Sequence, residues 1–286
     1  MTGVSTGIGW GTAKVLTRRG VRVFGSVRTQ ADAERLQAEF GERFTPLIFD
    51  VTDEAAVRRG AAQVAEALGG QTLRDQTLGG LVNNAGASIM APLAEQPISD
   101  VRRQLDINLV GPLIVTQAFL PQLGTDRTLR GKPGRIVNVS SVGAELAPPF
   151  LGAYVASKAG LEGLSHSLRR ELTPYGIGVV IVAPGSVATP IWDKGEADVE
   201  RWAGHPVYGA AIRSFAATML RSGRAGYTPE QLGEAIWTAL SAANPAIRYA
   251  PGPETVLTRL ALSVLPRRLL DRLLSRQIGL GPLPQR

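Results

Sequence analysis

Cysteine is absent from this chain of 286 residues, and histidine occurs at two positions, His166 and His205. A chain without cysteine forms no disulfide bond and no thiolate metal site, and it suits a reducing compartment such as the cytoplasm. The two histidines lie far apart and have no carboxylate at the spacing of a metal ligand, so we expect no metal site. His166 is interpreted as a structural or surface residue.

Long apolar runs and clusters of charge are also missing. No segment approaches the roughly 20 apolar residues that span a bilayer, and the first residues do not resemble a signal peptide. We therefore expect a cytoplasmic protein without a transmembrane segment. The net charge of +7 raises the question of nucleic acid. The basic residues are mostly Arg, scattered among acidic residues without interleaved aromatics, so we expect a solvated surface and no nucleic-acid partner.

The hydrophobic pattern alternates short apolar runs with longer amphipathic segments, in a chain that is 44% hydrophobic and 19% charged. This pattern predicts strands at 21–27, 46–51, 80–83, 135–140, 178–183 and 247–250, and helices at 11–19, 98–120, 153–172 and 229–242. The alternation is typical of βαβ units. We therefore expect one Rossmann-type α/β domain over residues 1–286, built on a doubly wound parallel sheet with helices on both faces.

A glycine-rich segment stands at the start of the chain, with Gly3, Gly7 and Gly9 spaced by four and two residues before a helical pattern. Glycines allow a tight turn and a close approach to a pyrophosphate, which the free N–H groups of the helix N-terminus would bind. A dinucleotide fold places a strand before this loop, and no such strand precedes Thr2. Either the start of the chain is misassigned and several residues are missing, or the protein is a degenerate relative.

The glycine segment matches the pattern T-G-x-x-x-G-x-G of the short-chain dehydrogenase/reductase family, and four further motifs of that family follow in order. They are Asn83-Asn84-Ala85-Gly86, Asn108, the set of Ser141 with Tyr154 and Lys158, and Pro184-Gly185 with Thr189. The chain therefore resembles this family over roughly residues 2–189.

The resemblance implies an oxidoreductase that transfers a hydride between NAD(P)(H) and an alcohol or a ketone or aldehyde. Tyr154 would be the general acid or base, and Lys158, four residues later on the same helix face, would favour its phenolate. Ser141 would hydrogen-bond the substrate oxygen. Lys158 would also hold the nicotinamide ribose, and Asn108 would anchor a water behind Lys158.

The resemblance also assigns the cofactor contacts. The pyrophosphate would lie on the glycine segment, Asp50 and Val51 would face the adenine, and Asn84, Ala85 and Gly86 would pass beside the adenosine ribose. The remaining contacts, made near the nicotinamide, come from Tyr154, Lys158, Pro184, Gly185, Val187 and Thr189, and the pyrophosphate contacts come from Gly3, Ser5, Thr6, Gly7, Ile8 and Gly9.

The choice of dinucleotide depends on Arg28. A carboxylate at the end of the strand 21–27 would bind the ribose 2′-OH, but the sequence there is Val27-Arg28-Thr29. Because an arginine can pair with a 2′-phosphate, we expect NADP rather than NAD. Two features oppose this prediction: Arg28 can be a solvated strand end, and Thr6 stands where many NADP-dependent relatives carry a basic residue.

Residues 190–226 are expected to form an irregular substrate lid, and residues 254–278 a helical extension. The lid aromatics, Trp192, Trp202, Tyr208 and Phe215, indicate either a hydrophobic substrate or packing of the lid itself. The helix at 266–277 has an apolar stripe of leucines (269, 270, 273 and 274) among arginines. It would pack on the domain or a partner, cover the substrate mouth, or lie on an anionic membrane surface.

Several alternatives remain open from the residues. The resemblance implies a homodimer or homotetramer formed by the helices that carry Asn108 and Tyr154. A catalytically silent dinucleotide-binding sensor and a truncated inactive relative are rival functions. A reductase of acyl-carrier-bound ketones would use the same chemistry. The tail is similar, less specifically, to steroid- and retinol-type dehydrogenases.

Overall fold

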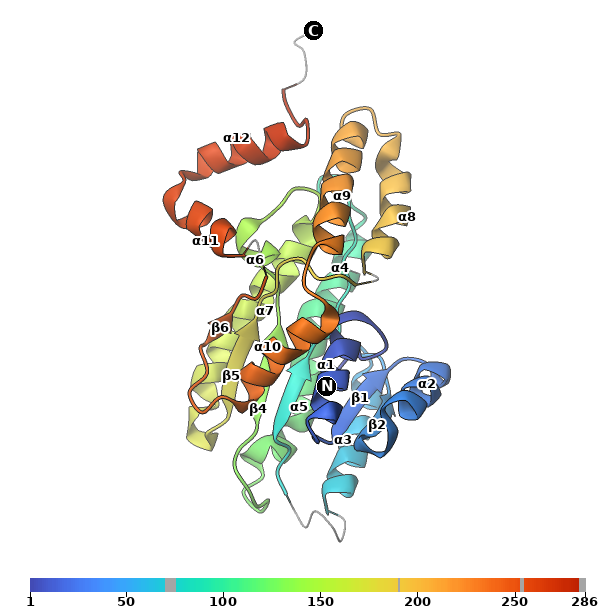
Figure 1. Cartoon of the computed structure of the whole chain (residues 1–286), viewed down its shortest axis with the longest axis vertical. Helices are drawn as coiled ribbons and strands as arrows, with labels where there is room; N and C mark the ends of the chain where they lie inside the picture. The colour runs from blue at the N-terminus through green and yellow to red at the C-terminus, as the bar shows by residue number, and fades with distance from the viewer. Residues whose placement is uncertain (70–75, 190, 253–254, 283–286) are drawn as a thin grey trace.

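The computed structural model describes residues 1–69, 76–189, 191–252 and 255–282, and the side chains of 191–195, 256, 257 and 259 are outside the description. Strands and helices alternate along the chain, with the helices flanking the strands (Figure 1). The first half comprises α1 (Gly7–Arg18), β1 (Val23–Val27), α2 (Gln30–Phe40), η1 (Gly41–Arg43), β2 (Phe44–Ile48), α3 (Glu54–Gly69), β3 (Gly80–Asn83), α4 (Ile98–Leu105), η2 (Asp106–Val110), α5 (Gly111–Leu120) and η3 (Pro121–Thr125).

The second half completes the alternation and adds helices beyond it. It comprises β4 (Arg135–Val139), α6 (Gly143–Leu146), α7 (Gly152–Glu171), η4 (Thr173–Tyr175), β5 (Gly178–Val182), α8 (Ile191–Ala203), α9 (Gly209–Arg224), α10 (Pro229–Ser241), β6 (Arg248–Tyr249), α11 (Thr255–Val264) and α12 (Arg267–Gln277).

The strands are parallel and form two hydrogen-bonded groups, β1-β2 and β3-β4-β5-β6. Strand β5 is buried at four of its five positions, and β4 likewise. Strands buried on both faces are typical of a parallel sheet covered by helices. The expected Rossmann-type α/β fold is therefore confirmed.

Residues 1–4 lie between the two groups of strands and connect them. Thr2 N donates to Val82 O of β3 at 3.0 Å, and Val4 N donates to Ser26 O of β1 at 3.0 Å. Further along, toward the amino ends of β1 and β3, the two strands border a cavity of about 360 Å³ lined mainly by apolar side chains, among them Phe24 and Leu81. The first four residues thus lie where a central strand of the sheet would run. The cavity lies beside them, between the amino ends of β1 and β3. Whether the start is misassigned stays a prediction.

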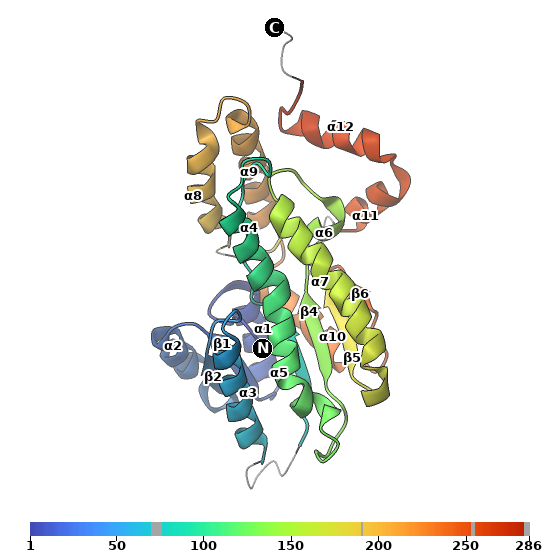
Figure 2. The same cartoon turned by 180° about the vertical axis from the view of Figure 1, so that it is seen from behind.

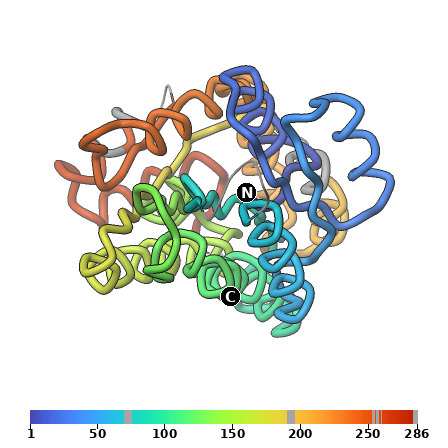
Figure 3. The backbone as a smooth tube through the Cα atoms, turned by 90° about the horizontal axis from the view of Figure 1, so that it is seen from below, coloured from blue at the N-terminus to red at the C-terminus, as the bar shows by residue number. Residues whose placement is uncertain are grey.

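Helices cover both faces of the strands. α1, α2 and α10 lie on one face in Figure 1, and α3, α5 and α7 lie on the other in Figure 2. The core on the second face joins Val57 and Val64 of α3 to Val115 and Phe119 of α5, all nearly inaccessible to solvent. Seen from below, the N-terminal segments and β4, β5 and α7 form opposite sides of the molecule (Figure 3).

The predicted helix at 98–120 is present, but it changes to π-helical geometry at Asp106–Val110. Among the described residues, the helical run Ile98–Thr125 of 28 residues has the length and the mean hydropathy (1.2) of a membrane-crossing helix. Since 44% of its apolar window is buried in the protein, and core helices pass the same test, this finding is weak support for a span. The absence of a transmembrane segment stays a prediction.

The prediction of an irregular lid was wrong. Residues 191–224 form two helices, α8 and α9, because their apolar residues recur at helical spacing and pack against Phe150 and Met90. Pro190 and the Trp192 side chain lie outside the described residues. Together with α11 and α12, the predicted C-terminal helices, α8 and α9 stand beyond the carboxyl ends of the strands (Figures 1 and 2).

Candidate active site

Tyr154 and Lys158 lie one turn apart on α7, as the spacing predicts. The Lys158 side chain is 5% exposed, and its Nζ lies 5.9 Å from the centre of the Tyr154 ring. Nζ donates a hydrogen bond of 2.8 Å to Val139 O at the end of β4. Burial lowers the pKa of Lys158 to about 8. The ammonium therefore still predominates at neutral pH, and it is held by the sheet rather than by solvent.

Tyr154 is half-buried and packs against an apolar cluster, called here the lid cluster: Met90, Phe150, Leu151, Ala211, Ile212, Phe215, Ala216 and Ile278. Burial raises the pKa of the Tyr154 hydroxyl, and a hydrogen bond with Ser141 acts in the opposite direction. Lys158 was expected to favour the phenolate. In this geometry desolvation has the largest effect on the Tyr154 pKa, and the Lys158 ammonium donates its hydrogen bond to Val139 O of β4.

Ser141 follows β4 and faces Tyr154. Its Oγ accepts a hydrogen bond of 3.0 Å from Gly143 N, in the first turn of α6. A Cβ added at Gly143 would lie 3.2 Å from Ser141 Oγ and 3.9 Å from Tyr154 Cε1. The backbone of α6 thus passes close to both hydroxyl-bearing side chains. The structure brings Ser141, Tyr154 and Lys158 together from two elements, the end of β4 and α7.

Asn108 is fully buried in the π-helical turn η2. Its Nδ2 donates to Ala87 O at 2.8 Å and to Ser157 Oγ at 2.9 Å, and its Oδ1 accepts from Ala87 N at 2.8 Å. Gly86 passes between this amide and Lys158: a Cβ there would lie 3.2 Å from Asn108 Oδ1 and 3.5 Å from Lys158 Nζ. Asn108 therefore connects η2, the 85–87 loop and α7. Its role as a water anchor stays a prediction.

The glycine loop, residues 2–9, turns sharply before and into the start of α1. Gly3 and Gly7 have positive φ angles of 68° and 59°, which favour glycine. A Cβ on Gly9 would lie 2.0 Å from Gly3 O, so no larger residue fits there. Thr6 precedes α1 without a side-chain hydrogen bond to the first turn. The backbone amides at the start of α1, including that of Ile8, are thus open to an anionic ligand such as a pyrophosphate.

The loop 83–86 holds the glycine loop in place. Asn84 Nδ2 donates to Thr2 O and Gly3 O, each at 3.0 Å, while Thr2 Oγ1 accepts from Asn84 N and Ala85 N. On the other side, Ser5 O accepts a hydrogen bond of 2.7 Å from Arg35. The predicted phosphate and ribose residues therefore form one hydrogen-bonded unit.

The predicted adenine side is formed by the ends of β1 and β2. Arg28 is exposed directly after β1, and Val51 is buried. Asp50 and Val51 come after β2 rather than at its end, because this strand stops at Ile48. Burial acts to raise the pKa of Asp50, but hydrogen bonds from Thr52 and the nearby charges of Arg28 and Arg103 lower it overall. Arg28 thus lies near the predicted adenosine end.

The predicted nicotinamide side follows β5. Thr189 lies against the glycine loop, since a Cβ on Gly7 would be 3.2 Å from its Cγ2. Val187 is buried and forms a parallel bridge with Tyr227. Pro184 O accepts from Val142 N at 3.0 Å, and Gly185 N donates to Pro251 O at 2.9 Å. This segment therefore links the Ser141 loop to the chain that leads into α11.

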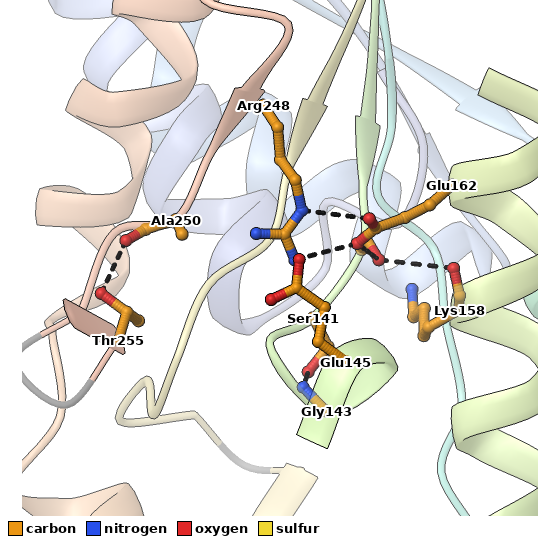
Figure 4. A network of polar contacts seen from close by, with 9 residues as sticks. Ser141, Gly143, Glu145, Lys158, Glu162, Arg248, Ala250 and Thr255 are labelled. Atoms are coloured by element: carbon orange, nitrogen blue, oxygen red, sulfur yellow. Dashed lines mark hydrogen bonds and ion pairs between the residues drawn. The ribbon is translucent and has the colours of Figure 1, made fainter. Parts of the chain in front are cut away.

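A buried polar network beside Ser141 was not predicted (Figure 4). Ser140 Oγ donates to Glu162 Oε1 at 2.8 Å, and the same carboxylate accepts two hydrogen bonds from Arg248 of β6. Glu162 stands four residues after Lys158, a spacing that places both on one side of α7. That spacing can be read from the sequence. The pairing of Glu162 with Arg248, 86 residues away, cannot.

The chain is similar to several known proteins over nearly its whole length. A family model described as "short chain dehydrogenase" matches residues 1–200. An NADPH-dependent 3-dehydrocapnine reductase of Ornithobacterium rhinotracheale is 30% identical over 97% of this chain and 96% of its own. Retinol dehydrogenase 5 of Mus musculus is 36% identical over 96% of this chain and 86% of its own. The crystal structure of a short-chain dehydrogenase from Streptomyces avermitilis superposes with a TM-score of 0.76 at 28% identity, covering 99% of this chain and 96% of that one.

The fold and the site define a Rossmann-type α/β protein with a Ser–Tyr–Lys set. The chain belongs to the short-chain dehydrogenase/reductase family of oxidoreductases, as its five motifs predict.

Proposed function

We propose that this chain transfers a hydride between NAD(P)(H) and an apolar alcohol or carbonyl compound, with Tyr154 as the general acid and base. The observation that carries this proposal is the convergence of the Tyr154 hydroxyl, Ser141 and Lys158 beside an apolar cluster. When bound, the dinucleotide supplies or accepts the hydride at its nicotinamide ring. The catalytically silent sensor is disfavoured, because the proton-transfer residues are present and positioned.

In the reductive direction, Tyr154 donates its hydroxyl proton to the substrate oxygen. Burial raises the pKa of Tyr154, so the hydroxyl keeps its proton at neutral pH and serves as an acid. Ser141 donates a hydrogen bond to the same oxygen and orients it. Lys158 stabilises the negative charge that develops on Tyr154 and holds the nicotinamide ribose. In the oxidative direction the proton returns to Tyr154.

The chain's own residues fit a dinucleotide. The glycine loop leads directly into α1, whose first backbone amides can bind a pyrophosphate, and Asn84 braces this loop. NADP is the preferred form because Arg28 is exposed where a 2′-phosphate would lie. The relative from Ornithobacterium rhinotracheale is named as NADPH-dependent, which agrees with this preference.

A thermal-shift titration with NADPH and with NADH tests the cofactor proposal. A bound ligand stabilises the folded chain by RT ln(1 + [L]/Kd), so tight binding raises the melting temperature. We expect a larger rise with NADPH. Arg28→Ala should weaken NADPH about tenfold and leave NADH nearly unchanged. Arg127→Ala, an exposed arginine before β4, is the matched control. Equal losses for both dinucleotides would contradict the preference.

The substrate is an apolar molecule, because Tyr154 lies against the lid cluster. Phe150 of this cluster contacts the rings of Phe215 and Tyr208 edge-on, at 6.0 and 6.1 Å. The lid aromatics thus pack on one another and also form an apolar wall near the proton-transfer residue. Two named relatives act on different molecules, so the substrate class is assigned from the cluster and not from their names. A panel of aliphatic and charged alcohols, compared by kcat/KM, tests it.

Three further predictions concern association, cellular location and membrane contact. Association into a homodimer or homotetramer and a cytoplasmic location stay predictions. Contact with an anionic membrane surface is proposed through α12, where Leu269 and Leu273 are 41% and 48% exposed among arginines.

A further inference from the structure

The residue before Ser141 is bonded to α7. Ser140 is 2% exposed. Its Oγ donates hydrogen bonds to Glu162 Oε1 at 2.8 Å and to Lys158 O at 3.5 Å. Since Ser140 and Ser141 are consecutive, the position of this hydroxyl constrains the backbone that carries Ser141. Glu162 is therefore linked to Ser141 through the adjacent residue, Ser140.

Glu162 is itself held by Arg248. Arg248 Nε donates to Glu162 Oε2 at 3.0 Å and Nη2 to Oε1 at 3.1 Å, a two-pronged pair whose side chains are 13% and 14% exposed. Such pairs combine charge with fixed geometry. Removing one partner of a buried pair leaves an uncompensated charge, which is costly. The carboxylate position is thus set by a guanidinium from β6.

The same guanidinium reaches the other side of Ser141. Arg248 Nη2 lies 3.3 Å from Glu145 Oε1 in α6, the helical turn whose first residue, Gly143, donates to Ser141 Oγ. Figure 4 places Arg248 between the two carboxylates, with Ser141 and Gly143 on the Glu145 side. The network therefore contacts the chain on both sides of Ser141. If Arg248 only anchored the short strand β6 to the sheet, its pair with Glu162 would be enough. The contact with Glu145 is an additional link to α6.

We propose that Glu162 and Arg248 are positioning residues that set the Ser141 hydroxyl relative to Tyr154 and Lys158. This inference rests on the proposed hydride transfer. The two residues act through Ser140 on one side of Ser141 and through α6 on the other. Neither touches the glycine loop, so their action is confined to the proton-transfer end of the site.

The test compares Glu162→Gln, Arg248→Met and the double variant with the wild-type chain. We expect kcat to fall about ten- to a hundredfold in each single variant, while the Kd for NADPH from thermal shift stays within twofold. Arg248→Lys, which keeps the charge but loses the fork, should recover part of kcat. The double variant should lose no more than the worse single variant, because both substitutions break one unit.

A control separates positioning from general stability. Glu230→Gln removes an ion pair of 2.8 Å between α10 and α1 that does not touch Ser141. It should lower the melting temperature without lowering kcat. If Glu162→Gln behaves in the same way, or if it weakens NADPH as strongly as it lowers kcat, the positioning role is wrong.

A second readout does not need turnover. The Gly143 amide is bonded to Ser141 Oγ, so its hydrogen exchange reports the position of this hydroxyl. We expect Glu162→Gln and Ser140→Ala to speed this exchange about tenfold or more, and Glu230→Gln to leave it unchanged. Unchanged exchange in all variants would overturn the inference. A wild-type chain without turnover would overturn the proposed function but leave this readout valid.

Discussion

The centre formed by Ser141, Tyr154 and Lys158 and the helices beyond the strands are held together by different forces. At the centre, polar side chains bond to the backbone over short distances, such as Lys158 to Val139 O and Asn108 to Ala87. The outer helices rely on the lid cluster and on partly exposed pairs, such as Arg201 of α8 with Asp100 at 3.3 Å. The described part of α12 buries no residue.

This difference has consequences for substitutions. A buried hydrogen bond has a strict geometry, and its loss leaves a partner unsatisfied. Apolar packing tolerates small shifts, and exposed ion pairs contribute little. Changes at the centre should therefore alter turnover or stability strongly, whereas changes on α12 should alter association with other surfaces.

The largest effect is expected at Tyr154. Tyr154→Phe removes the hydroxyl and should lower kcat about a thousandfold or more, because general acid–base catalysis contributes on this scale. Binding of NADPH, measured by thermal shift, should remain, since the glycine loop is untouched. Turnover equal to that of the wild-type chain would contradict the mechanism.

Asn108→Ala should mainly affect stability. It removes three buried hydrogen bonds and leaves the Ala87 amide and carbonyl without this partner. The free energy of unfolding should fall by about 3 kcal/mol, measured by urea denaturation. Thr238→Ala, on the exposed side of α10, is the control and should change it by less than about 0.5 kcal/mol. A loss below about 1 kcal/mol for Asn108→Ala would mean that the π-helical turn relaxes.

The buried ammonium group of Lys158 predicts a pH dependence. It donates a hydrogen bond of 2.8 Å to Val139 O, and burial lowers its pKa from 10.5 to about 8. Because the unfolded chain binds more protons between these values, stability should fall as the pH drops from 10.5 to 8, by at most about 1.4 kcal/mol per unit. Lys158→Met should remove this slope in the melting temperature. A slope that persists in Lys158→Met would assign it to other groups.

The smallest effect on stability is expected for Leu269→Ser combined with Leu273→Ser. Both side chains are substantially exposed, so the free energy of unfolding should change by less than about 1 kcal/mol. Co-sedimentation with vesicles of phosphatidylglycerol and phosphatidylcholine should nevertheless decrease. Ile247→Ser, at an exposed apolar residue before β6, is the control. Equal sedimentation of all three chains would rule out membrane contact through α12.

Much of the strand pattern was predictable. The predicted strand 80–83 coincides with β3, and 135–140 and 178–183 end one residue beyond β4 and β5. Continuous runs of β-branched residues are typical of strands buried on both faces of a parallel sheet, so these segments could be assigned as strands from the sequence. The strand predicted at 46–51 instead spans Phe44–Ile48, and helices α8 and α9 were predicted as irregular. The apolar residues of α8 and α9 recur at helical spacing, but the helices are stabilised by packing on Phe150 and Met90, which come from a distant part of the chain.

The order of residues along the chain was enough to identify the family and to place Tyr154, Lys158 and the glycine loop, because these features depend on spacing within a turn or a helix. Contacts between distant residues required the folded chain. Arg248 pairs with Glu162 across 86 positions, and residues 1–4 bond to both β1 and β3. Such pairings follow from how strands and helices pack in three dimensions, and short-range sequence patterns carry no information on them.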